Sequence, residues 1–182
     1  MEHPDIRLDG YSVVRLTATD SAAAADLQDL FERCTDFHEL SEGAPTRPTA
    51  GPEELAMLPP GKDPEDKFPF GVYAAPGRMV GYLELMRDYP AASEWWIGLL
   101  MLDPAVRRRG HGGRIYRAAA EWVSAQGGSM IRLGVLEQNP DALRFWQRQG
   151  FHELHRQPHV SDTGYRSQLI VMACACRPTR PD

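Results

Sequence analysis

Residues 103–114, Asp-Pro-Ala-Val-Arg-Arg-Arg-Gly-His-Gly-Gly-Arg, are the most informative segment of this 182-residue chain. An apolar run at 95–102 precedes the segment and an amphipathic pattern at 110–126 follows it, so it connects a predicted strand to a predicted helix. Its three glycines let a ligand approach the backbone closely. The first backbone N–H groups of a helix have no partner within the helix and can bind an anion. Together with four nearby arginines, these features predict a pyrophosphate site.

A structural explanation also fits this segment, because a tight turn on a solvated basic face uses the same residue types. Two other phosphate motifs do not fit it. The spacing Gly-x-Gly-Gly differs from the dinucleotide-binding G-x-G-x-x-G, and the Lys-Ser/Thr pair that completes a P-loop is missing.

Hydrophobic periodicity predicts a mixed α/β (α+β) fold, with a sheet of about seven strands flanked by about four helices. Strands are expected at 11–17, 70–74, 80–86, 95–102, 130–136, 151–154 and 168–176. Helices are expected from Asp20 or Ser21 through Cys34, at 53–58, at 110–126 and from Asn139 to Gly150, with a loop at 41–52. The three consecutive strands predict an antiparallel meander, and the later strand-helix alternation predicts parallel pairing.

Length and composition indicate one domain at 1–176, with a disordered tail at 177–182. A formal net charge of -5 argues against a general nucleic-acid binder. The apolar run at 95–102 is far shorter than a membrane span, and residues 1–5 have no features of a signal peptide. We therefore expect a cytoplasmic protein with no membrane partner.

The cysteines and histidines predict neither disulfides nor a metal site. Cys34, Cys174 and Cys176 form no CxxC pair, which suits a reducing compartment. Three histidines at 152, 155 and 159 have ligand-like spacing, but no further ligand is evident. We expect no bound metal.

Two blocks of sequence carry a family resemblance. Arg-Arg-Arg-Gly-His-Gly at 107–112, preceded by Leu-Asp-Pro at 102–104, resembles the signature of the GNAT superfamily of acyl-CoA-dependent N-acetyltransferases. Downstream, Asn139-x-x-Ala142-x-x-x-Trp146-x-x-x-Gly150-Phe151 resembles a second family segment, Asn…Ala…Tyr…Gly-Phe. The blocks occur in the family's order, and the resemblance covers roughly residues 68–154.

This resemblance implies a sheet that splays apart between the strands ending near Leu102 and Leu136, with acetyl-CoA in the opening. The backbone groups of Met101 and Leu102 would pair with the pantetheine amides, and the turn would hold the pyrophosphate. Asn139 would contact pantetheine beside its role as an N-cap. The implied cofactor-binding residues are Met101, Leu102, Arg107, Arg108, Arg109, Gly110, His111, Gly112, Gly113, Arg114, Asn139, Phe145 and Trp146. For Phe145 and Trp146, plain core packing is an equal alternative.

The acid and base of the reaction are less defined. Trp146 stands where the family has a tyrosine that can protonate the leaving thiolate, so Tyr82, Tyr89, Tyr116, a water molecule or simple thiolate departure must substitute. Two strand carboxylates, Glu84 and Glu94, are candidate general bases. Each also fits an exposed residue on a strand face.

The function implied is acetyl transfer from acetyl-CoA to a primary amine of a small molecule or protein, by direct attack in the sheet cleft. Residues 34–42 are expected to help select the acceptor, and their acidic groups suit a polyamine, an amino sugar or a protein amine. The alternatives are a non-catalytic acyl-CoA-binding sensor and a nucleotide-binding scaffold unrelated to CoA. The exposed final strands would allow a homodimer.

Overall fold

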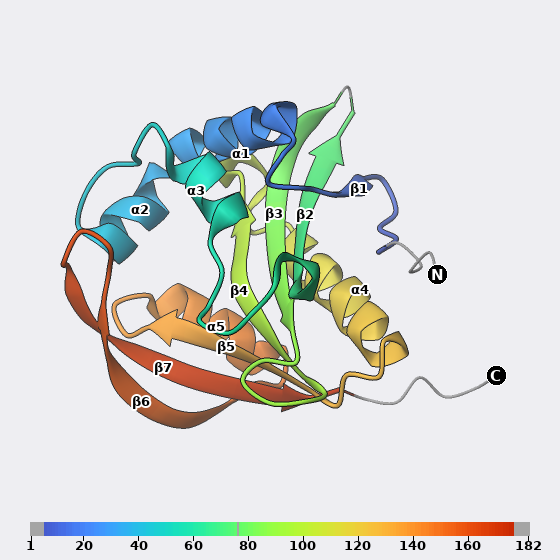
Figure 1. The fold of residues 1–182 in the computed structure, drawn as a ribbon, viewed down its shortest axis with the longest axis vertical. Helices are drawn as coiled ribbons and strands as arrows, with labels where there is room; N and C mark the ends of the chain where they lie inside the picture. Colours follow the sequence, from blue (N-terminus) through green and yellow to red (C-terminus); the bar gives the residue numbers. More distant parts are fainter. Residues whose placement is uncertain (1–5, 76, 177–182) are drawn as a thin grey trace.

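A seven-stranded mixed sheet organises the computed structural model, which describes residues 6–75 and 77–176 (Figure 1). The strand order is β1-β2-β3-β4-β5-β7-β6. All neighbours pair antiparallel except β4 and β5, which pair parallel. The expected fold class, the meander and the parallel pair are thus confirmed. The expected tail at 177–182 lies outside the described residues.

The elements follow the predicted order. The strands are β1 (Ser12–Arg15), β2 (Lys67–Ala74), β3 (Arg78–Arg87), β4 (Glu94–Leu102), β5 (Met130–Leu136), β6 (His152–Val160) and β7 (Arg166–Ala175). The helices are α1 (Ser21–Arg33), α2 (Thr35–Glu42), α3 (Ala50–Ala56), α4 (His111–Ala125) and α5 (Pro140–Arg148), with short 3-10 turns η1 (Pro64–Asp66) and η2 (Pro104–Val106).

Several ends shift by up to three residues, including α3, which begins at Ala50 rather than 53, and two differences are larger. The first helix stops at Cys34, whose non-helical backbone (φ -106°, ψ 36°) separates α1 from α2, so the described residues form five helices rather than about four. Strand β6 continues to Val160 instead of ending at 154. Most of its residues are exposed on both faces, so its sequence lacks the apolar alternation that reveals a strand.

Local capping explains where two helices begin. Asp20 Oδ1 accepts hydrogen bonds from the backbone N–H groups of Ala22 (2.9 Å) and Ala23 (3.1 Å) at the start of α1. Asn139 Oδ1 accepts from Ala142 N (3.0 Å) at the start of α5, where Pro140 occupies the first helical position.

Helices cover both faces of the sheet (Figure 1). On one face, α1 and α3 bury a cluster that includes Leu27, Leu30 and Tyr82. On the other face, α4 and α5 bury a larger cluster that includes Trp95 and Trp122. These two clusters hold β3 and β4 rigidly between them.

Strands β4 and β5 are hydrogen-bonded to each other along only about the first half of their length. Their parallel ladder runs only from Glu94↔Met130 to Ile97↔Leu133. Beyond it, residues 99–102 remain paired with β3 alone, and residues 134–136 with β7 alone. The expected splay is therefore present.

A β-bulge lies where the splay begins. The register between β3 and β4 shifts between Glu84 and Leu85, which leaves Gly98 as the extra residue of β4. A Cβ atom at position 98 would collide with Glu84 Oε1, so a larger residue would fit only if this carboxylate moved.

Asp103 fixes the chain as it leaves β4. Its carboxylate is almost fully buried and accepts hydrogen bonds from Arg33 Nε (2.8 Å), Arg78 Nη2 (3.0 Å) and Ala105 N (2.8 Å). Although burial alone would raise the pKa of Asp103, the bonds from Ala105 and Arg33 hold that pKa below its ordinary value. The segment that follows β4 thus has a defined starting point.

We expect Asp103→Asn to lower the free energy of unfolding by about 1–3 kcal/mol, because hydrogen bonds to a charged group are lost. Since the folded pKa is lowered, the wild-type advantage is complete above about pH 4 and disappears as the pH falls through the folded value. Urea unfolding of both proteins from pH 7 to pH 3 measures this difference. Equal stabilities at pH 7 would contradict the anchoring role.

Candidate functional site

The start of α4 presents free backbone donors beside the splay. Gly110 is the N-cap with φ 82°, and Arg108 before it has φ 62°, so the turn bends sharply into the helix. The N–H groups of His111, Gly112 and Gly113 belong to the first helical turn and have no acceptor within the helix. Because the helix dipole also points its positive end here, this turn can bind an anion.

A cavity of about 650 Å³, which we call the splay cavity, opens between β4, α5 and the start of α4. Its apolar wall comes from the end of β4 and from two aromatic residues of α5, and its rim is basic. The lining residues are Asp36, Phe37, Leu40, Leu100, Met101, Leu102, Arg107, Arg108, Gly112, Asn139, Asp141, Ala142, Arg144, Phe145, Trp146 and Arg148.

Gly112 brings the anion-binding turn against the cavity wall. A Cβ atom at this position would lie 3.4 Å from two ring atoms of Phe145 and 3.6 Å from Leu102 Cδ1. Alanine would therefore fit in ordinary van der Waals contact, whereas a longer or charged side chain would project into the cavity.

The backbone of β4 offers polar groups to the same space. Asp103 N donates to Val80 O at 2.9 Å. Because bonded and non-bonded pairs alternate along an antiparallel ladder, the groups of Met101 point to β3, and those of Leu100 and Leu102 point into the splay. This differs from the expectation that Met101 and Leu102 face the opening together.

The sequence-predicted cofactor residues divide into two groups. Those that line the splay cavity are Met101, Leu102, Arg107, Arg108, Gly112, Asn139, Phe145 and Trp146. Those that surround the turn outside the lining are Arg109, Gly110, His111, Gly113 and Arg114. Arg114 Nη2 donates to Asp9 O (2.8 Å), and His111 Nδ1 lies 3.1 Å from the Tyr11 hydroxyl, so both tie the N-terminal segment to α4.

Arg107 is engaged within the protein rather than pointing free into the cavity. Its Nε donates to Leu102 O (2.8 Å), and its Nη1 and Nη2 donate to the Asp36 carboxylate. These hydrogen bonds lower the pKa of Asp36. The expected contact between Arg107 and a ligand phosphate would require this pair to open.

The two aromatic residues of α5 combine packing with cavity lining. Trp146 is 7% exposed and meets Tyr116 and Phe151 edge-on, at centroid distances of 5.5 and 5.1 Å. Phe145 is less buried and lies 4.8 Å from Trp146. Both alternatives weighed from the sequence, core packing and a cavity wall, therefore hold at once.

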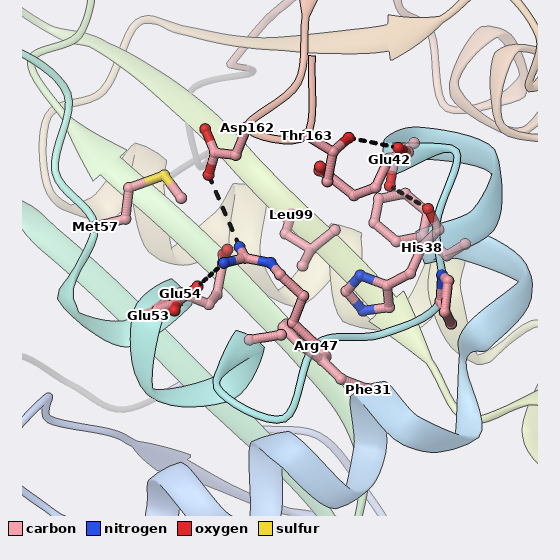
Figure 2. Close-up of a pocket in the computed structure, with 14 residues that line it drawn as sticks. Phe31, His38, Glu42, Arg47, Glu53, Glu54, Met57, Leu99, Asp162 and Thr163 are labelled. Carbon is pink, nitrogen blue, oxygen red and sulfur yellow. Dashed lines mark hydrogen bonds and ion pairs between the residues drawn. The ribbon is translucent and has the colours of Figure 1, made fainter. Parts of the chain in front are cut away.

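A smaller cavity of about 100 Å³, the α2–α3 pocket, lies on the other side of β4 (Figure 2). It is enclosed by Phe31, Phe37, His38, Ser41, Glu42, Pro45, Arg47, Ala50, Glu53, Glu54, Met57, Leu99, Asp162 and Thr163. Phe37 lines both cavities, whereas the consecutive residues Leu99 and Leu100 point to opposite faces of β4 and line one cavity each.

Acidic groups outnumber basic ones around the α2–α3 pocket. Figure 2 shows Arg47 reaching between Glu53 (2.6 Å) and Asp162 (3.9 Å), so its charge is already matched. Glu42 and Glu54 add two further carboxyl groups. The pocket is thus suited to a cationic ligand.

His38 is the buried imidazole of this pocket. Its ring lies 4.9 Å from Phe31 and 5.7 Å from Phe37, and its Nε2 is a buried atom without a hydrogen-bond partner among the described residues. Burial lowers the pKa of His38. The neutral ring therefore has an unused polar atom at the pocket.

Glu84, a candidate base, lies behind the α2–α3 pocket rather than in its lining. Its carboxylate receives Lys67 Nζ at 2.7 Å and the Tyr82 hydroxyl at 3.2 Å. Glu54, which does line the pocket, has its carboxyl group close to that of Glu84. Burial and the neighbouring Glu84 charge raise the pKa of Glu54 to about 8.

Glu94, the other candidate base, lies at the closed end of the splay. It faces Met130 in the paired part of the ladder, and its carboxylate pairs with Arg132, with Nε 2.7 Å from Oε2 and Nη2 2.9 Å from Oε1. The structure therefore gives Glu94 an ion-pairing role between neighbouring strands.

Sequence reasoning missed Glu54, Arg144 and Arg148. Arg144 and Arg148 are four residues apart on α5, so one face of that helix lines the cavity rim, a spacing that was visible in the sequence. Glu54 had no such signal, because its partners Lys67 and Glu84 come from two strands remote in sequence. Residues 34–42, expected to face the acceptor, supply lining to both cavities.

Comparison with known proteins identifies the class. Residues 24–151 match the model of the Acetyltransferase (GNAT) family. This match spans most of the chain, and the chain belongs to the GNAT family of acetyltransferases. A search of curated protein sequences gave no match.

Solved structures of acetyltransferases share the fold. The ribosomal-protein-S18-alanine N-acetyltransferase of Escherichia coli is 16% identical, covers 94% of this chain and 97% of its own, and has a TM-score of 0.66. The spermidine N-acetyltransferase of Vibrio cholerae, in complex with CoA and spermine, is 16% identical over 93% and 97% of the two chains, with a TM-score of 0.68. The ribosomal-protein-S5-alanine acetyltransferase of Vibrio fischeri is 16% identical over 96% and 98%, with a TM-score of 0.70. At these identities the likeness concerns the fold alone.

Two features are absent from the described part of the chain. Within residues 6–75 and 77–176, no helix combines the length and apolar character that crossing a bilayer needs. The same residues contain no group of three or more His, Cys, Asp or Glu side chains arranged to bind a metal ion.

We expect Glu94→Gln to destabilise the fold by about 1–3 kcal/mol, because the partly buried Arg132 loses its ionic partner. Acetyl transfer by the folded variant should stay within about twofold of wild type. Urea unfolding and a thiol-release assay measure the two effects. Unchanged stability with lost transfer would return Glu94 to a catalytic role.

Proposed function

We propose that this chain transfers an acetyl group from acetyl-CoA to a primary amine, with acetyl-CoA in the splay cavity and the amine in the α2–α3 pocket. The observation that carries the proposal is the parting of β4 from β5 beside the free N–H groups of α4. A polar strand edge opened in the interior needs a partner. Anion-binding donors at one end of that edge match the diphosphate of CoA.

The cofactor contacts follow from this placement. Backbone N–H groups between Arg108 and Gly113 would hold the pyrophosphate, and Arg109 and Arg114 would add positive charge, with Arg107 joining if it leaves Asp36. The backbone of Leu100 and Leu102 would pair with the pantetheine amides. Phe145 and Trp146 would flank the pantetheine arm, with Asn139 at its side.

The acceptor would be a cationic amine, since acidic groups outnumber basic ones in the α2–α3 pocket. The Vibrio cholerae spermidine N-acetyltransferase, crystallised with CoA and spermine, gives one precedent for such an acceptor on this fold. Because Phe37 lines both cavities, the amine and the thioester would meet where the two cavities come together beside it.

Direct attack by the amine suits the surroundings of Cys34 better than an acetyl-cysteine intermediate. Cys34 is fully buried, its Sγ lies 3.4 Å from Leu102 O, and burial raises the pKa of the thiol. A thiol that stays protonated is a poor nucleophile.

Calorimetric titration with acetyl-CoA, with ADP and NAD as controls, tests the cofactor site. We expect micromolar binding of acetyl-CoA and weaker binding of both controls. Gly112→Asp should lower the affinity about 100-fold or more, because it places a negative charge near the diphosphate. Gly112→Ala is the matched control and should bind nearly as wild type, since its Cβ fits beside Phe145. Equal affinity for Gly112→Asp would remove the turn from the site.

A thiol-release assay with a panel of amines tests the reaction. The panel contains 1,4-diaminobutane, 1-aminobutane, glucosamine and an alanine-initiated hexapeptide. We expect the diamine to exceed 1-aminobutane by about tenfold or more in kcat/KM, because it carries a second positive charge into an acidic pocket. Tight acetyl-CoA binding with no transfer to any amine would favour the alternative of a non-catalytic acyl-CoA sensor.

A further inference from the structure

We propose that Glu54 is the group that takes the proton from the acceptor ammonium, with Lys67 and Glu84 as positioning residues behind it. The inference rests on the proposed function, since it assigns the base within the same acceptor pocket. It gives Glu84 a role different from that of the base, for which the sequence made it a candidate.

The position of Glu54 joins the acceptor space to a buried ionic cluster. Glu54 is on α3 and lines the α2–α3 pocket, and its carboxyl group lies close enough to that of Glu84 on β3 for the two charges to interact. Leu99, the strand partner of Glu84, also lines the pocket and precedes Leu100 of the splay cavity. Glu54 therefore faces the acceptor pocket, which shares Phe37 with the cavity expected to hold the thioester.

One buried cation, Lys67, lies near the carboxyl groups of Glu54 and Glu84. Lys67 is 4% exposed, and its three ammonium donors are taken by Glu84 Oε2 (2.7 Å), Met57 O (2.8 Å) and the backbone carbonyl of Glu54. The Lys67 charge balances that of Glu84, so an ionised Glu54 adds a negative charge that nothing in the cluster compensates. An ammonium that enters the pocket supplies the missing positive charge.

This imbalance makes Glu54 a stronger base than an ordinary glutamate. With the pKa of Glu54 at about 8, taking a proton from an alkylammonium of pKa about 10 is unfavourable by only about 100-fold. For a glutamate of ordinary pKa, the same proton transfer would be unfavourable by about a millionfold. The free amine needed for attack is therefore accessible within the bound pair.

The reaction converts one ammonium and one thioester into an amide, the CoA thiol and one released proton. The ammonium gives one proton to the Glu54 carboxylate, and the nitrogen lone pair then forms a bond to the thioester carbonyl carbon. The C–S bond breaks with its electron pair going to sulfur, and the second nitrogen proton passes to the thiolate to give the CoA thiol. Glu54 then releases its proton to solvent.

His38 is the competing base in the pocket. Accepting a proton would create an imidazolium between Phe31 and Phe37, and burial already lowers the pKa of His38. His38 is thus a weaker base than Glu54. The charged or titratable groups around Glu54 are Lys67 on β2, Tyr82 and Glu84 on β3, Glu53 on α3, His38 and Glu42 on α2, Arg47 and Asp162.

The pH profile of kcat/KM tests the proposal, with acetyl-CoA and the best amine of the panel above. We expect the wild-type profile to rise and then level above about pH 8. Glu54→Gln should be about 100-fold slower at pH 7.5 and should keep rising to the pKa of the amine itself, because only the free amine then reacts. Glu54→Asp retains a carboxyl group and should restore the levelling. A wild-type profile in Glu54→Gln overturns the proposal.

Three variants separate Glu54 from its neighbours. Glu53→Gln is the matched control on the same helix and should keep the levelling point, whatever its effect on KM. Glu84→Gln removes the neighbouring negative charge and should move that point to lower pH, a change that a merely structural role would not produce. If the pH profile of His38→Gln no longer levels while that of Glu54→Gln matches wild type, His38 rather than Glu54 is the base.

A stability measurement needs neither substrate. Because the folded state holds the Glu54 proton to higher pH than the unfolded chain does, wild-type stability should fall as the pH rises from about 5 to about 8. Glu54→Gln should lack this fall, and equal pH dependence in both proteins would overturn the assignment. Absence of acetyl-CoA binding by wild type would end the proposed function itself, whereas bound acetyl-CoA with an unchanged profile in Glu54→Gln would end only the role of Glu54.

Discussion

The parting of β4 from β5 after Ile97 is the constraint on which the rest of the structure depends. A sheet interior tolerates unpaired backbone groups only where something else satisfies them. Here the helices on either side, the Asp103 anchor and the glycine turn of α4 all hold the opening in place. The bulge at Gly98 begins the separation, and Arg33 and Arg78 fix its far end through Asp103. The cavity is therefore a product of strand pairing that stops early.

Local sequence patterns made much of the fold around this opening predictable from the sequence. The glycine turn, the N-caps Asp20 and Asn139 and the apolar run of β4 act over a few residues, so their patterns are visible in the chain. Two motifs in the family's order then implied the splay. The break at Cys34 and the extension of β6 from 154 to Val160 were not predicted. No glycine or proline marks the break, and the extension has no apolar alternation and contains Pro158, which argues against a strand. Their conformations depend on tertiary packing.

In the candidate site, too, some residues could be predicted from local sequence and others depend on contacts that only the fold creates. The residues of the turn could be named because the backbone itself supplies the anion-binding groups. Side-chain partners could not be named, since Arg107 is held by Asp36 and Glu94 by Arg132 across long stretches of chain. Glu54 is the clearest case: its chemistry depends on how many cations lie near two carboxyl groups. That number is a property of the folded cluster rather than of any sequence segment.

Gly98 gives the β4 bulge a consequence for how sequences of this fold vary. A side chain at position 98 would overlap the present position of the Glu84 carboxylate, so the carboxylate would have to move from its place beside Lys67. Substitutions at positions 84 and 98 are thus expected to be correlated, although Gly98 is neutral and Glu84 is charged. A relative that places a larger residue in the bulge should lack the glutamate. It would then leave the buried lysine on β2 without its counter-ion, so three positions on three strands should vary as one unit.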